Sequence, residues 1–80
     1  MNFGEALELL KGGKKVARKG WNGKGMLLFL VFPTELETKA DVEIFSAQKS
    51  IAMKTADSSI VVGWTASQTD MLAEDWIVVN

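Results

Sequence analysis

The sequence contains no cysteine, no histidine and no tyrosine. Without cysteine the 80-residue chain can form no disulfide bond, and without cysteine or histidine it lacks the usual ligands of a structural zinc site. The commonest general base and the most reactive protein nucleophile are missing as well. These absences make catalysis and metal binding poor candidates, so we expect no catalytic residues, no metal and no cofactor.

Long apolar stretches are also absent from the sequence. The longest apolar run, residues 26–32, is far too short to cross a bilayer as a helix. The amino terminus lacks the basic start and apolar core of a signal peptide, because Phe3 is followed at once by Gly4 and Glu5. We therefore expect a cytoplasmic protein without a membrane partner, and the lack of cysteine is consistent with a reducing compartment.

Small size limits the core that this chain can build. A chain of this length buries about 60–65% of the surface that its unfolded form exposes. Yet 48% of its residues are hydrophobic, with three Trp and four Phe. One small protomer can hardly cover that much apolar surface. We therefore expect a single domain over residues 1–80 that assembles into a homo-oligomer with two-fold symmetry.

Charge is distributed unevenly along the chain. Residues 1–25 carry six basic and two acidic side chains, a net charge of +4, whereas the remaining residues carry a net charge of −5. The acidic remainder argues against a long polyanion such as DNA as the partner. A basic segment beside glycines is better suited to a small anion.

Two helices are predicted from capping signals. Asn2 and Glu5 have the spacing of a capping box, and Gly12 follows the last residue of the apolar helical pattern. Ser67 is expected to cap a short second helix that extends to residue 73, with Asp70 in its first turn, where a carboxylate suits the helix dipole.

Period-two patterns and turn residues predict the strands. The expected strands are residues 14–21, 26–32, 50–55, 60–65 and 76–79. Residues 26–32 are apolar throughout and are predicted to be buried on both faces, and Asn22-Gly23 is a two-residue hairpin signal. The order of these elements predicts an α+β fold with an antiparallel sheet of about four to five strands.

Residues 33–48 are a connecting excursion whose pattern supports two interpretations. Thr34 and Glu37 could cap a short helix, whereas residues 41–45 alternate like a strand. Neither interpretation is favoured by the residues alone.

Residues 64–76 combine two indoles with polar side chains at a helix start. Trp64 lies where a strand leads into a helix, a place where anions and ribose hydroxyls are often bound, and we favour a binding role for it. Ser67 and Asp70 are explained adequately as helix cap and first-turn carboxylate, although both could also contact a ligand. Trp76, at the head of an apolar strand, is most simply a core residue, and residues 71–76 are expected to anchor this segment in the core.

Residues 18–25 form a second block, in which cations and glycines surround an indole. Trp21 lies beside a turn, where a buried indole is less expected, so a core role and a ligand or interface role both stay open. Arg18 is a candidate ligand for phosphate, because its planar guanidinium suits phosphate geometry and lies close to Trp21 in sequence. The neighbouring lysines are expected to be solvated.

Four segments of the chain resemble the second class of Thoeris anti-defense proteins, which are small phage-encoded proteins. They are residues 3–10 (FGEALELL), 14–26 (KKVARKGWNGKGM), 51–57 (IAMKTAD) and 64–76 (WTASQTDMLAEDW). The resemblance covers nearly the whole chain except residues 33–48.

The resemblance implies a molecular sponge in the host bacterial cytoplasm. Such proteins bind glycocyclic ADP-ribose, a messenger that a TIR-domain enzyme makes from NAD, and hold it uncleaved so that the downstream effector stays inactive. The family forms homotetramers with ligand pockets between protomers, and some members hold cyclic oligonucleotides at a separate site. By this resemblance Trp21 and Trp64 are pocket aromatics. The polar wall around them is formed, by the same resemblance, by Thr65, Ala66, Ser67 and Asp70. Two further positions that match the family's motifs are Asn22 and Met26.

Two other functions remain as alternatives. The chain could be an enzyme that degrades the messenger, or a phage protein-binding module with no small ligand. Binding without turnover is the interpretation that we favour, because the chain lacks the side chains that most often carry acid–base and nucleophilic catalysis.

Overall fold

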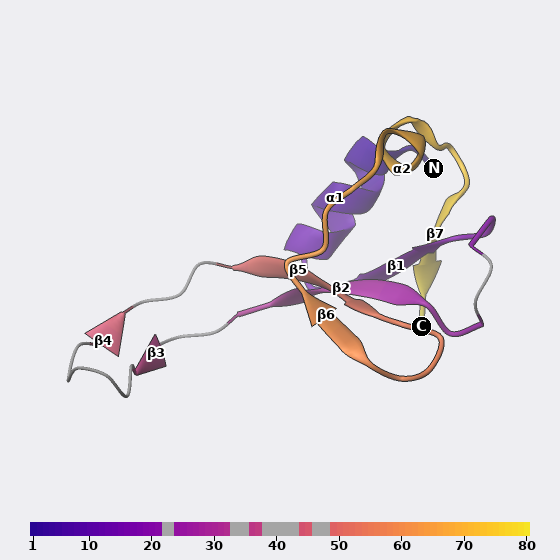
Figure 1. The fold of residues 1–80 in the computed structure, drawn as a ribbon. Coiled ribbons are helices and arrows are strands. Elements are labelled where there is room, and N and C mark those ends of the chain that lie inside the picture. Colours follow the sequence, from indigo (N-terminus) through magenta and orange to yellow (C-terminus); the bar gives the residue numbers. More distant parts are fainter. Residues whose placement is uncertain (22–23, 33–35, 38–43, 46–48) are drawn as a thin grey trace.

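A computed structural model describes residues 1–21, 24–32, 36–37, 44–45 and 49–80 of the chain. Five strands form one antiparallel sheet in the order β6-β5-β2-β1-β7, and two short strands, β3 and β4, pair separately (Figure 1). The elements in chain order are α1 (Phe3–Lys11), β1 (Lys15–Arg18), β2 (Leu27–Val31), β3 (Leu36–Glu37), β4 (Ile44–Phe45), β5 (Ser50–Lys54), β6 (Ile60–Val62), α2 (Gln68–Leu72) and β7 (Trp76–Val79). This architecture confirms the predicted α+β fold.

Helix α1 begins and ends where the sequence predicts. The Glu5 amide donates to Asn2 Oδ1 at 2.8 Å, and the Asn2 amide donates to Glu5 Oε1 at 3.0 Å, so the capping box is present. At the other end Gly12 is the C-cap, and Gly13 follows with a φ of +88°. That backbone conformation favours glycine and turns the chain out of the helix.

The core lies between α1 and one face of the large sheet. Strand register places Val16 opposite Leu28, and both side chains are fully buried. Leu10 of α1 packs against them, together with Trp76 at the start of β7. Trp76 is 1% exposed and is the largest fully buried side chain among the described residues, which confirms its predicted core role.

The opposite face of the sheet is also apolar, but both helices lie on the other side (Figure 1). Register places Ala52 between Phe29 and Val62 on this face, and Ala17 opposite Ile77. The prediction that residues 26–32 are buried on both faces is therefore wrong for one chain. Only Leu28 of β2 is fully buried, because α1 covers just one side of that strand.

Four strands are shorter than predicted, and the two that lose most, β1 and β6, each end where the backbone turns. Beyond Arg18 the chain turns, and the Trp21 amide donates back to the Arg18 carbonyl at 3.3 Å. Strand β6 ends at Val62, just before Gly63, whose φ of +84° departs from strand geometry. The amides of Gly63 and Trp64 both donate to the Ile51 carbonyl, at 3.0 and 2.9 Å. This bend carries Trp64 toward the core side of the sheet.

The excursion of residues 33–48 contains a small strand pair. Leu36–Glu37 pairs antiparallel with Ile44–Phe45, which supports the strand interpretation at residues 44–45 and places Glu37 in a strand. Thr34, the other residue of the proposed helix cap, lies outside the described residues. In the part of the chain that the structure covers, neither helix is long and apolar enough to span a membrane.

Candidate functional site

Four aromatic rings meet at the end of the sheet beneath α2. Trp76 lies at the centre, with ring centroids 5.4 Å from Phe3, 5.4 Å from Trp21 and 6.4 Å from Trp64. The centroids of Trp21 and Trp64 are 6.5 Å apart. The fold therefore brings together the two indoles that the sequence pairs as candidate ligand contacts.

The indoles differ in exposure, and this divides their roles. Trp76 is buried, whereas Trp21 and Trp64 are half-buried and pack against the core from its edge. The planes of Trp21 and Trp64 meet at 66°, so these two rings do not form parallel walls around a flat ligand. Trp21 and Trp64 can each offer exposed ring surface, and the buried Trp76 packs against both of them from the core.

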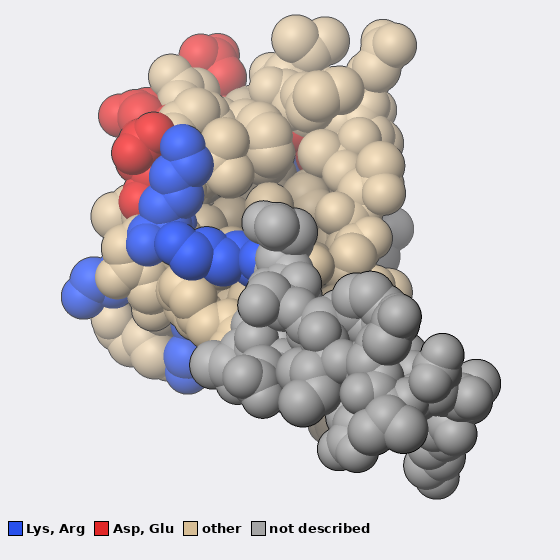
Figure 2. All heavy atoms as spheres, turned by 90° about the vertical axis from the view of Figure 1, so that its left-hand side faces the viewer, with Lys and Arg blue, Asp and Glu red and all other residues tan. Residues whose placement is uncertain are grey.

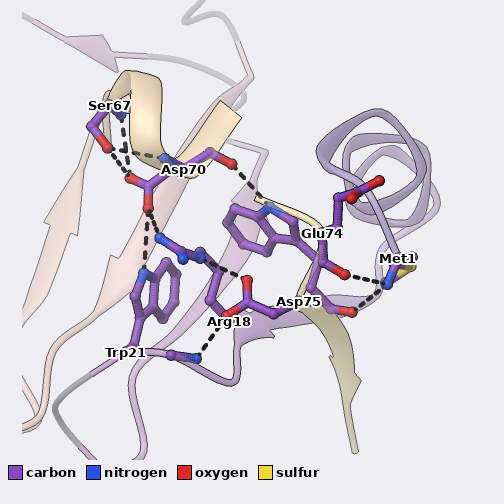
Figure 3. Close-up of polar contacts among 9 residues, drawn as sticks. Met1, Arg18, Trp21, Ser67, Asp70, Glu74 and Asp75 are labelled. Carbon is purple, nitrogen blue, oxygen red and sulfur yellow. Dashed lines mark hydrogen bonds and ion pairs between the residues drawn. The ribbon is translucent and has the colours of Figure 1, made fainter. Parts of the chain in front are cut away.

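Asp70 is the centre of the polar contacts in this region (Figure 3). Its Oδ1 accepts from Arg18 Nη1 at 2.9 Å and from Trp21 Nε1 at 3.4 Å. Its Oδ2 accepts from the Ser67 amide at 3.2 Å and from Ser67 Oγ at 2.9 Å. The Asp70 carbonyl also accepts from Trp76 Nε1 at 3.1 Å. The carboxylate is thus engaged by four donors of its own chain.

The Ser67 and Asp70 contacts include a complete capping box for α2. Ser67 Oγ accepts from the Asp70 amide at 3.1 Å, so the predicted N-cap is confirmed. The expected core role of the following residues is wrong for Met71 and Leu72, which are 47% and 80% exposed. A helix as short as Gln68–Leu72 turns only part of its surface to the core, and Asp70 and Trp76 connect it to the sheet instead.

Arg18 joins two carboxylates. Its Nε donates to Asp75 Oδ1 at 2.9 Å, while Nη1 reaches Asp70. The second oxygen of Asp75 accepts from the Gly20 amide at 2.9 Å. The sequence suggested Arg18 as a phosphate ligand, whereas the structure shows two of its donors engaged by carboxylates of its own chain. The two carboxylates belong to segments more than 50 positions away in the sequence, which sequence spacing does not reveal.

These contacts shift the protonation equilibria in one direction. The hydrogen bond from Arg18 is the main cause of the lowered pKa of Asp75. For Asp70, burial acts to raise the pKa, but the hydrogen bonds from Arg18 and Ser67 together outweigh it and the pKa is lowered. The hydrogen bonds to Asp75 and Asp70 in turn raise the pKa of Arg18. All three groups are therefore ionised at neutral pH.

The remaining predicted site residues are less closely connected. Thr65 is exposed and Ala66 half-buried in the link between β6 and α2, next to Trp64. Met26 is half-buried just before β2, and none of the polar contacts described above involves it. Asn22 lies outside the described residues.

Two residues of this site are missing from the sequence prediction. Asp75 accepts from Arg18 and from the Gly20 amide, and both residues lie at the same end of the β1–β7 pair, just beyond the end of β1 and just before the start of β7. The only sequence signal is that Asp75 directly precedes the predicted strand at residue 76. Which strand it would adjoin depends on the sheet order, and this order cannot be read from local pattern.

The basic side chains of Lys14, Lys15, Lys19 and Lys24 are solvent-exposed, as predicted. On the face seen in Figure 2, basic and acidic side chains lie next to one another in the described part of the surface. Such a mixed surface is unlike the broad basic face of a protein that binds a long polyanion.

Comparison with known proteins places the chain in a family. The sequence model described as the Thoeris anti-defense 2-like domain matches residues 1–79. A protein of Bacillus phage SP01 named Thoeris anti-defense 2 is 46% identical over 88 aligned positions, which cover 100% of this chain and 96% of the relative. Both similarities extend over the site as well as the core.

Proposed function

The chain belongs to the Thoeris anti-defense 2-like family, and on this premise we propose that it binds glycocyclic ADP-ribose and sequesters it uncleaved. The family membership gives it a role in phage anti-defense against Thoeris immunity. The proposed mechanism is a sponge in the host cytoplasm, which lowers the free concentration of a TIR-derived messenger below the level that its effector needs.

The observation that carries this proposal is the pairing of two half-buried indoles at one end of the sheet. Trp21 and Trp64 come from distant segments, yet their ring centroids are 6.5 Å apart beside the start of α2. An exposed indole face can stack a base with about 1–3 kcal/mol. Thr65, exposed next to these rings, supplies a hydroxyl donor for a ribose or phosphate oxygen of the ligand, whereas Ser67 Oγ, which donates its proton to Asp70, can accept from a ribose hydroxyl.

The acid–base properties of the site support binding without turnover. A general acid or base works best with a pKa near the operating pH. Asp70 and Asp75 have lowered pKa values and are held by Arg18, so they are poor proton donors at neutral pH. We therefore propose that the protein is not an enzyme.

We further propose that the site is completed by a second protomer in a homotetramer. Because the ring planes of Trp21 and Trp64 meet at 66°, the two indoles do not enclose a flat ligand between them, and each ring can cover only one side of it. The apolar sheet face opposite α1 supplies a surface for assembly, and all three residues of the edge strand β6 are exposed on a single chain. Ile60 and Val62, which lie on this face, are 59% and 62% exposed, and Val61, on the side of α1, is 48% exposed. Burying such a face between copies is a usual solution for a small apolar chain.

The test is to incubate the purified protein with a panel of cyclic ADP-ribose isomers and cyclic dinucleotides, measure its melting temperature, and then analyse the heat-released ligand. The proposal predicts a rise in melting temperature with glycocyclic ADP-ribose and its recovery unchanged. Time-dependent loss of the ligand indicates a degrading enzyme and contradicts sequestration. No rise with any compound favours a protein-binding module. A rise with a cyclic dinucleotide that persists in Trp21→Ala identifies a separate site for cyclic oligonucleotides.

A further inference from the structure

We propose that Arg18 and Asp75 are positioning residues that fix the Trp21 indole at the binding site. The Arg18 guanidinium connects the Asp75 carboxylate to the Asp70 carboxylate, and Asp70 accepts the indole N–H of Trp21. The binding arm of this inference rests on the proposed function, whereas the geometric arm does not.

Trp21 is held from two sides, and both contacts lead to this network. Its indole N–H donates to Asp70 Oδ1 at 3.4 Å. Its backbone follows directly on Gly20, whose amide donates to Asp75 Oδ2 at 2.9 Å. Asp75 therefore controls the position of the Trp21 backbone, while Asp70 controls the orientation of the ring. Because Arg18 donates to both carboxylates, it couples the position of Asp75 to that of Asp70 (Figure 3).

This ion-pair network differs from an ordinary surface salt bridge. The side chains of Arg18, Asp70 and Asp75 are 16%, 14% and 33% exposed, and Arg18 reaches the two carboxylates through different nitrogens at 2.9 Å each. By contrast, the Lys11–Glu8 pair of α1 is 62% and 74% exposed and joins residues one helical turn apart. Exposed pairs of that kind contribute little, whereas a bridged pair of low exposure fixes geometry.

Gly20 offers a direct way to disturb the network without removing any of its charges. A Cβ at this position would lie 2.9 Å from Asp75 Oδ2 and 3.6 Å from Arg18 Nη2. Its φ is not positive, so alanine introduces no backbone strain of its own. Gly20→Ala therefore pushes the Asp75 carboxylate away from the Gly20 amide. Gly12→Ala is the matched control, because a Cβ there meets nothing closer than 3.5 Å.

The experiment compares Asp75→Asn, Gly20→Ala and Gly12→Ala with the wild-type protein by ¹H–¹⁵N NMR of the three indole N–H signals, assigned with Trp→Phe variants. The inference predicts that the Trp21 indole signal shifts and exchanges faster with water in Asp75→Asn and Gly20→Ala. The Trp64 signal stays as in the wild type in these two variants, and all three indole signals stay as in the wild type in Gly12→Ala. In a parallel titration, the Kd for glycocyclic ADP-ribose rises about tenfold in the two network variants, the loss expected for one hydrogen bond to a charged group.

A merely structural role predicts a different pattern. If both network variants melt earlier but keep the wild-type Trp21 signal and the wild-type Kd, the positioning role is overturned. If the wild-type protein does not bind glycocyclic ADP-ribose, the proposed function fails, and the NMR arm still decides. An unmoved Trp21 signal then overturns the inference, and a shift confined to Trp21 supports it.

Discussion

The two helices of this protein begin with the same local motif but connect to the rest of the molecule very differently. Asn2 and Glu5 form a capping box at α1, and Ser67 and Asp70 form one at α2. The Glu5 carboxylate is exposed and caps its own helix. The Asp70 carboxylate caps its helix and also accepts from Arg18 and Trp21, residues 52 and 49 positions away.

This difference separates a structural cap from a cap that organises a site. Helix α1 covers the core with Ala6 and Leu10, so apolar packing holds it in place and its cap has only a local task. Helix α2 has no buried residue of its own, and polar contacts through Asp70 fix it to the sheet. The proposed ligand site beside α2 therefore depends on charged and indole donors rather than on helix burial.

We expect the largest effect at Trp76, which packs both in the core beneath α1 and against the aromatic rings beside α2. Trp76→Ala removes the central ring of the aromatic cluster and the indole N–H that donates to the Asp70 carbonyl. We expect a loss of about 3–5 kcal/mol in the free energy of unfolding, as for other buried Trp→Ala changes. Urea denaturation at fixed protein concentration measures it. A loss below about 1 kcal/mol would show that Trp76 does not connect the core to the site.

Matched substitutions in the two caps test whether the Asp70 carboxylate contributes more to stability than the Glu5 carboxylate. Asp70→Asn weakens hydrogen bonds from the Arg18 cation and leaves that charge without one partner, so we expect a loss of about 1–3 kcal/mol in unfolding free energy. Glu5→Gln keeps an acceptor at an exposed position, and we expect a change within about 0.5 kcal/mol. The same denaturation curves measure both. Equal losses would mean that the long-range contacts of Asp70 add no stability.

Acid should remove the contribution of the Asp75 contact. Because its pKa is lowered in the folded protein, Asp75 adds stability above the unfolded pKa of about 3.9, and this stability is lost as pH falls through the folded value. We expect Asp75→Asn to melt at a lower temperature than wild type at pH 7. The difference should shrink as the pH falls below about 4, first because the carboxyl of the unfolded chain is protonated there, and at still lower pH because the folded carboxyl is protonated too. Melting curves from pH 2 to 7 check it, and a constant difference would contradict the ionic contact.

The smallest difference is expected between the two cap side chains. Asn2→Ala and Ser67→Ala each remove one cap acceptor, and each should cost about 1 kcal/mol in unfolding free energy. The two losses should agree within about 0.5 kcal/mol, because the Ser67 side chain, like that of Asn2, makes its hydrogen bonds within its own helix cap. A much larger loss for Ser67→Ala would place Ser67, rather than Asp70, at the centre of the site's contacts.

Local patterns predicted much of the fold because its elements are encoded locally. Both caps, the stop at Gly12 and the final strand from Trp76 follow from short-range spacing. Strand ends were less predictable. The sequence does not show that β6 stops before Gly63, because this depends on the positive φ of that glycine. The exposure of Leu72 was missed because a helix this short does not have to bury an apolar residue.

The candidate site was only partly predictable. Trp21 and Trp64 stood out by their unusual surroundings, and the family resemblance paired them. The bridge from Arg18 to Asp75 was not foreseen, because it depends on β1 lying beside β7, with Arg18 opposite Trp76. That pairing joins the first and the last strand of the chain, and no spacing rule within a short segment specifies it.

One calorimetric titration tests whether α2 begins at the proposed ligand site whereas α1 does not. Glycocyclic ADP-ribose is titrated into wild type, Glu5→Gln and Asp70→Asn, and the ligand is then released by heat and analysed. We predict equal Kd values for wild type and Glu5→Gln, a Kd raised about tenfold or more for Asp70→Asn, and ligand recovered uncleaved. Equal Kd values for all three proteins, or no binding to the wild type, would show that the start of α2 is not the proposed ligand site.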